Sequence, residues 1–216
     1  MKKILIIFLV FSTASFCFAA GQRQSIEIGA GYHRRSGRLP ENQTVLGIEV
    51  EAVIPSFAMS LSGVTFLTEN VGIGAYVNFL FPQEFRTTAM GLTVTADRSD
   101  FDFIFGMGFL AGPTFMLFRS GPFSIPLAVG FHCHMLWANT AFLDTRLITI
   151  GLGSNITGEF HFNERIYAFA RFQASVDLYS WATSQINTIF GSMRSSISGG
   201  IFTWAVNPSI GIGFKW

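Results

Sequence analysis

The chain has 216 residues, of which 50% are hydrophobic and 12% are charged, and its formal net charge is +1 at pH 7. So small a net charge argues against nucleic acid, or any other strongly charged molecule, as a partner. The 25 Phe and 22 Gly residues favour strands over helices, because glycine is a poor helix former and phenylalanine suits a half-buried pleated surface.

Residues 1–19 have the organisation of a secretory signal peptide. A basic head and a short apolar core precede a small-x-small cleavage site that ends at Ala19. Cleavage there leaves 20–216 as a single domain with one cysteine, Cys133, which excludes an intramolecular disulfide. A lipoprotein anchored through Cys17 is the weaker alternative, because a bulky phenylalanine precedes that cysteine.

Apolar and polar residues alternate with a period of two through most of the remaining chain, which is typical of strands with one apolar face. Large apolar side chains share one face of each strand, and glycine, serine, threonine, asparagine and isolated charges share the other. The predicted strands are 25–33, 44–54, 57–66, 70–81, 88–97, 101–117, 123–138, 147–162, 166–178 and 203–216. Pro55 is expected to mark a turn or bulge, and 180–199 to form the largest loop.

A helical hairpin over 103–118 and 123–138 is the rival interpretation, because both segments are nearly continuously apolar. Prolines interrupt both segments, and each is short for a membrane-spanning helix of ~20 residues. Strands are therefore the better prediction here.

The last predicted strand carries the most specific pattern. One face of this strand is apolar and ends on an aromatic residue, and the other face carries small and polar residues. The apolar face includes Trp204, Ile212, Phe214 and Trp216. In transmembrane β-barrels such aromatic residues lie in the interfacial girdle. The pattern predicts a closing strand whose apolar side chains face lipid and whose small or polar ones face a lumen.

The number of strands is predicted to be ten, with eight as the alternative. Both termini of single-chain bacterial barrels lie on the periplasmic side, so the number is even. It is ten if 57–66 and 88–97 are both strands and eight if neither is. A soluble, lipocalin-like barrel is disfavoured because it would place apolar residues inside and charges outside.

In pattern the chain resembles the small bacterial outer-membrane barrels of the OmpW and OmpX type, particularly short spirochaetal members. The resemblance includes the GIGFKW terminus and the hairpin GPTFMLFRSGPFSIPLAVGFH. It implies an all-β, antiparallel, up-and-down transmembrane barrel in the outer membrane, with outer-membrane lipid and the outer-membrane assembly machinery as partners. OmpX-like members are surface-exposed or adhesive barrels, whereas OmpW-like members are associated with passage of small apolar solutes. No functional residue of either can be carried over.

Charged and histidine side chains on the polar faces are the candidates to line the lumen. They are Glu49, Glu51, Asp102, His132, His134, Glu159, Arg171 and Asp177. The turn at 163–165 predicts that Glu159 lies opposite Arg171 and forms an ion pair with it. His132 and His134 could bind a metal, but a site needs a third or fourth ligand and none is identifiable.

These features predict a narrow, porin-like pore or conduit for small solutes, because open water channels belong to barrels of about sixteen strands. The acidic excess predicts cation selectivity that depends on Glu49 and Glu51. The alternative is a surface-exposed structural or adhesin-like barrel whose outer loops, 34–43, 139–146 and 180–199, contact a host ligand. No catalytic, cofactor or metal site is predicted, since two glutamates two residues apart on a strand do not indicate acid–base catalysis.

Overall fold

A computed structural model describes residues 23–38, 50–188, 191–199 and 203–216. The predicted signal peptide and Glu49 lie outside these residues. Within them the chain is almost entirely β-structure, and no helix there is long and apolar enough to cross a membrane. The segments for which a helical hairpin was the rival prediction are both strands.

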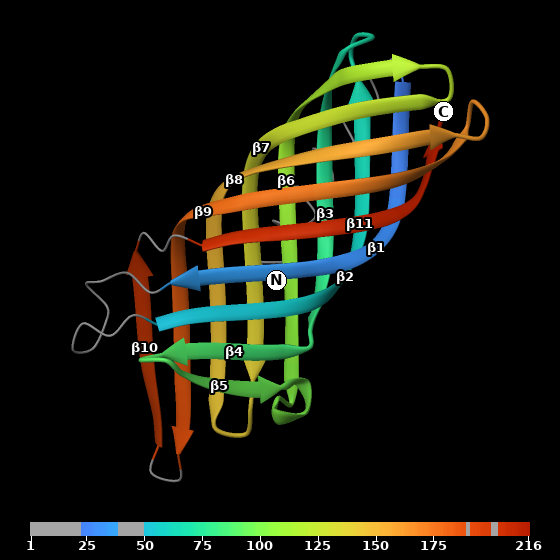
Figure 1. The fold of residues 1–216 in the computed structure, drawn as a ribbon. Helices are drawn as coiled ribbons and strands as arrows, with labels where there is room; N and C mark the ends of the chain where they lie inside the picture. Colours follow the sequence, from blue (N-terminus) through green and yellow to red (C-terminus); the bar gives the residue numbers. More distant parts are fainter. Residues whose placement is uncertain (1–22, 39–49, 189–190, 200–202) are drawn as a thin grey trace.

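Antiparallel strands close into a barrel (Figure 1). The first strand pairs with the second on one side and with the last on the other, which closes the ring. The eight ring strands of the described chain are β1 (Arg23–Arg38), β2 (Val50–Phe66), β3 (Val71–Pro82), β6 (Phe103–Ser120), β7 (Phe123–Asn139), β8 (Leu143–His161), β9 (Ile166–Thr188) and β11 (Thr203–Lys215). The prediction of ten strands is therefore wrong, and the alternative of eight fits.

One reason for the lower number is that β2 continues through Pro55. The β2–β3 ladder ends at Ser56, and the β2–β4 ladder begins at Val53, so Pro55 lies where one partner strand replaces another. Its carbonyl accepts a hydrogen bond from the Gln83 N–H at 3.0 Å. Proline has no N–H to donate, and no hydrogen bond of the ladders needs one at this position. The described part of the predicted strand 44–54, from Val50 onward, thus belongs to the same strand as 57–66. Ile54, expected to face lipid, faces the interior instead and is 7% exposed.

The other reason is a hairpin outside the ring. β4 (Glu84–Ala89) pairs with the start of β2, and β5 (Leu92–Asp97) pairs with β4. Met90 and Gly91 between them have φ angles of 52° and 76°. Two positive φ values in a two-residue turn are typical of a type I′ hairpin, so the predicted strand at 88–97 contains a turn. A short 3₁₀ helix, η3 (Arg98–Asp100), leads into β6.

A second hairpin replaces the loop predicted at 180–199. β9 extends beyond the ring, and β10 (Gly191–Gly199) pairs only with it (Figure 1). Paired β-strands therefore extend past the ring at this part of the barrel.

The cross-strand register determines how wide the ring is. Starting at Gly63 on β2, we follow the paired residues from each strand to the next around the ring. After one circuit the path returns to β2 at Val53, ten residues from where it began. A ring of this size has strands tilted by about 40° and an interior just wide enough for side chains to fill.

The outer surface is an apolar band with aromatic residues near both ends. Rings on four neighbouring strands contact one another in sequence, with centroids 5.8–6.3 Å apart: Phe57, Phe81, Phe105 and Trp137. At the opposite end Phe160 contacts Phe123 at 5.1 Å and Phe162 at 5.4 Å. Two aromatic girdles around an apolar band match the outer surface of a transmembrane barrel.

The two ends of the barrel differ. Short turns at 67–70, 121–122 and 162–165 lie at the end that carries Arg23 and Trp216. The β4–β5 and β9–β10 hairpins lie at the opposite end, which we call the outer end (Figure 1). In bacterial barrels the short turns are periplasmic and the longer connections extracellular.

Candidate functional site

The candidate site is the barrel interior, where polar side chains from all sides of the ring converge. One group lies towards the short-turn end and centres on Glu27. Its carboxylate accepts hydrogen bonds from Ser62 Oγ at 2.6 Å and Tyr167 Oη at 2.9 Å, and it forms an ion pair with Arg171. Both charged side chains are 2% exposed. The pair therefore bridges β1 and β9, on either side of β11, in a desolvated environment.

Glu159 has different partners from those the sequence predicted. It accepts a hydrogen bond from Ser124 Oγ at 2.5 Å and lies 3.1 Å from both Lys215 Nζ and His161 Nε2. In the β8–β9 register Glu159 lies opposite Phe169, and Arg171 lies opposite Thr157. The predicted Glu159–Arg171 pairing is wrong because the hairpin is centred one residue earlier, which moves each cross-strand partner by two residues.

A second group lies towards the outer end and centres on Asp177. Asp177 forms an ion pair with Arg35, accepts a hydrogen bond from Thr203, and lies 3.3 Å from His132 Nδ1. Arg35 also donates to Thr149 Oγ1 at 2.7 Å and to Thr203 Oγ1 at 2.9 Å. Arg35 was expected in the first outer loop, 34–43, but β1 continues to Arg38, and the alternation that places His33 inside also places Arg35 inside.

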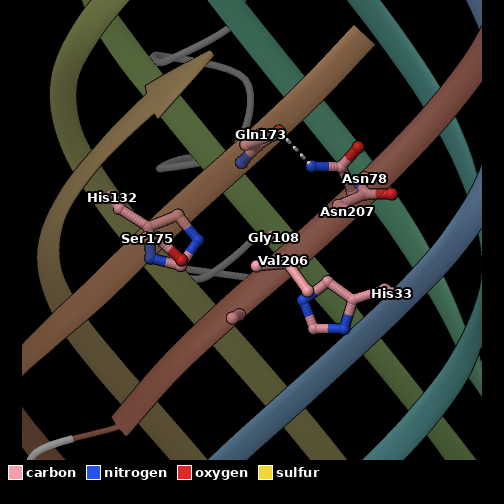
Figure 2. A pocket seen from close by; sticks show the side chains of 9 residues that line it. His33, Asn78, Gly108, His132, Gln173, Ser175, Val206 and Asn207 are labelled. Carbon is pink, nitrogen blue, oxygen red and sulfur yellow. Dashed lines mark hydrogen bonds between the residues drawn. The ribbon is translucent and has the colours of Figure 1, made fainter. Parts of the chain in front are cut away.

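An amide layer separates the two groups. Asn78 Nδ2 donates to Gln173 Oε1 at 3.0 Å, and Asn207 lines the same cavity (Figure 2). His33 and His132 line the same cavity, which has room for about one water molecule. The His33 ring also stacks on that of His134, with centroids 5.8 Å apart.

Apolar side chains complete the filling of the interior. Near the outer end Ile54, Ile104 and Leu136 form a buried cluster, with Phe85 and Phe101 packed against it. A second cluster includes Val64, Phe66, Tyr76, Leu110 and Ala128. Side chains thus occupy the lumen at successive levels of the described chain.

Three of the predicted lumen residues are not placed inside. Glu51 lies opposite Arg38 on the face of β2 that points away from the interior, and it accepts a hydrogen bond from Ser36 Oγ at 3.0 Å. Asp102 is exposed just before β6 begins, and Glu49 is outside the described residues. The acidic pair on which the predicted cation selectivity depended is therefore not found within the described interior.

The chemistry available to the interior is limited by access. Asp177 is 0% exposed and the His132 side chain 3% exposed, so this acid–base pair is almost completely shielded from bulk solution. In the described ranges no group of three or more histidine, cysteine, aspartate or glutamate residues is arranged to hold a metal ion. The arrangement crosslinks strands across the lumen.

The closing-strand residues named above all lie on the outer surface. Trp204, Ile212, Phe214 and Trp216 are 40–62% exposed, while the alternate residues Thr203, Asn207 and Ser209 are buried. An apolar band of this extent, with charges enclosed, is stable in lipid and not in water.

Comparison with solved structures finds the same architecture. The chain is similar to the outer membrane protein OprG from Pseudomonas aeruginosa, with a TM-score of 0.60 and 12% identity over 91% of this chain and 98% of that one. This chain has the fold of the small bacterial outer-membrane β-barrels. It is also similar to the outer membrane protease OmpT from Escherichia coli (TM-score 0.56, 8% identity, 90% and 97% coverage) and to the outer membrane protein AlkL (TM-score 0.54, 10% identity, 91% of each chain).

No family model and no curated protein matches the sequence. The solved structures are consistent with the OmpW/OmpX-like type and with an outer-membrane location. The resemblance to spirochaetal members stays a prediction.

Proposed function

We propose that this barrel is a surface-exposed structural or adhesin-like protein that acts through the β-hairpins at its outer end. The filled interior is the observation that carries this proposal. A solute moving along the axis would meet the Ile54 cluster, then the Arg35–Asp177 pair, then the Glu27–Arg171 pair. Passage would require breaking buried ion pairs, which costs several kcal/mol each.

The outer end offers a surface for a partner. Apolar side chains on the β4–β5 hairpin and in the β7–β8 turn are at least 70% exposed: Met90, Leu92, Val94 and Phe142. These residues lie beyond the aromatic girdle, so lipid does not cover them. Exposed apolar side chains grouped on one end of a molecule are typical of protein-binding surfaces.

Planar-bilayer recording of the refolded protein tests the closed interior. We expect no steady ionic conductance. Steady cation-selective channels would contradict the proposal and support the narrow conduit that the sequence favoured.

Adhesion of cells that display the protein to immobilised extracellular-matrix proteins tests the outer surface. The double variant Leu92→Ser/Val94→Ser should reduce adhesion several-fold at equal surface expression. The matched control is Thr93→Ala/Thr95→Ala, which changes the other face of the same strand and should adhere as the wild type does. Equal adhesion of all three proteins, or none above cells that lack the barrel, would contradict the proposal.

A further inference from the structure

Arg34 is a charged residue on the lipid-facing surface of the ring. It is exposed and alternates with the inward residues His33 and Arg35. Its cross-strand neighbours are apolar, Pro55 on β2 and Val206 on β11. An arginine in such surroundings is unfavourable unless its guanidinium reaches water or an anion.

The depth of Arg34 follows from its aromatic neighbours. Tyr32, two residues nearer the short-turn end, lies opposite Phe57 of the outer girdle. Ser36, two residues nearer the outer end, lies opposite Trp204. Because girdle tryptophan and tyrosine side chains lie at the level of the lipid headgroups, Arg34 lies at that level too.

The protein does not neutralise this charge within the described part of the chain. None of the salt bridges found there involves Arg34. Glu51, the carboxylate on the same outward face, accepts a hydrogen bond from Ser36 and lies opposite Arg38. A guanidinium at headgroup depth is thus left facing the lipid.

We infer that Arg34 is a binding site for the phosphate group of an outer-leaflet lipid. A guanidinium presents two parallel N–H donors that match two phosphate oxygens, so it binds phosphate better than a point charge does. The position on the outer surface selects a lipid headgroup over a soluble anion, because the approach from the side is through the bilayer. Tyr32 and Trp204 would flank the bound headgroup.

Native mass spectrometry of protein reconstituted in mixed bilayers tests this inference. The bilayers contain phosphatidic acid and digalactosyl diacylglycerol, which carries no phosphate. Wild-type protein should retain about tenfold more phosphatidic acid than Arg34→Gln, the factor that one charge-assisted hydrogen bond contributes. Arg34→Lys should retain an intermediate amount, and Arg194→Gln, on the β9–β10 hairpin outside the ring, should behave as the wild type.

The inference would be overturned if Arg34→Gln retained as much phosphatidic acid as the wild type. It would also be overturned if Arg194→Gln lost as much phosphatidic acid as Arg34→Gln, since that would indicate general charge attraction. A second measurement compares the unfolding midpoint of the wild type in bilayers with and without phosphatidic acid, and in galactolipid alone with added inorganic phosphate. The phosphate lipid should raise the midpoint and free phosphate should not. Equal midpoints in both lipids, or protection by free phosphate, would contradict a lipid site even if Arg34→Gln does not fold.

Discussion

Removing the negative charge of the Glu27–Arg171 pair should strongly destabilise the barrel. The Arg171 side chain is 2% exposed, and Glu27→Gln removes its opposite charge. Thr157 Oγ1 remains as an acceptor for the Arg171 Nε–H, at 3.3 Å. An uncompensated buried charge of this kind costs about 3–5 kcal/mol. Ser62 and Tyr167 also lose part of their interaction, because an amide accepts hydrogen bonds less strongly than a carboxylate.

The structure provides a matched control for this measurement. Glu84 and Arg86 form an ion pair on the β4–β5 hairpin, with side chains 24% and 48% exposed. Because exposed pairs contribute about 0–1 kcal/mol, Glu84→Gln should change the free energy of unfolding by no more than that. Denaturant titration of protein folded in lipid vesicles, followed by tryptophan fluorescence, measures both variants.

A double-mutant cycle separates the pair from the side chains around it. Glu27→Gln/Arg171→Gln removes the unpaired charge and should recover part of the stability lost in Glu27→Gln. We expect a coupling energy of about 2 kcal/mol or more, since coupling within a buried charged network reaches 0.5–3 kcal/mol. If Glu27→Gln costs no more than Glu84→Gln, the interior is hydrated and the reasoning from burial is wrong.

The remaining predictions concern orientation, wall packing and the outer closure. In a cysteine-free background, Leu92→Cys should label with a membrane-impermeant maleimide on intact cells and Glu164→Cys should not; the reverse result would invert the orientation. Gly151→Val should reduce the free energy of unfolding by about 3 kcal/mol or prevent folding, because a Cβ there would lie 1.9 Å from the Val176 carbonyl oxygen. A free energy of unfolding within ~0.5 kcal/mol of the wild type would contradict this close approach of the two strands. Leu136→Ala should reduce the free energy of unfolding by about 2–5 kcal/mol, because it opens a cavity in the buried cluster. It should produce no bilayer conductance, because the Arg35–Asp177 pair still fills the next level of the lumen. Steady channels in this variant would show that the apolar cluster alone closes the lumen.

The faces of most ring strands could be predicted because alternation is a local property. Most large apolar side chains of these strands lie outside and most small or polar ones inside, as β11 illustrates, although Tyr76 and Leu110 point inward. The number of strands could not be predicted in the same way. Whether Pro55 ends a strand depends on which neighbour pairs there, and the alternation at 88–97 continues through a turn whose positive φ angles no pattern of hydrophobicity reveals.

The candidate site was less predictable for a related reason. Position on the polar face identified His132, Glu159, Arg171 and Asp177 as inward residues, but it did not identify their partners. An error of one residue in the centre of a hairpin moves each cross-strand partner by two residues, as the Glu159–Phe169 pairing demonstrates. Arg35 was missed because a run of arginines looks like a solvated loop, although continuing the alternation from His33 would have placed it inside.

The partners also escape prediction because they do not lie on adjacent strands. Arg35 on β1 reaches Asp177 on β9, although β11 lies between these strands, and Asp177 reaches His132 on β7 across β8. Asn78 on β3 and Gln173 on β9 lie on opposite sides of the ring, and their hydrogen bond requires a ring narrow enough for two side chains to span it, which an eight-strand barrel satisfies. In a wider ring the same charges would face water and could favour cations. The number of strands therefore changes the functional interpretation, since the same inward charges would line a passage in a wider ring but pair with one another in the eight-strand ring.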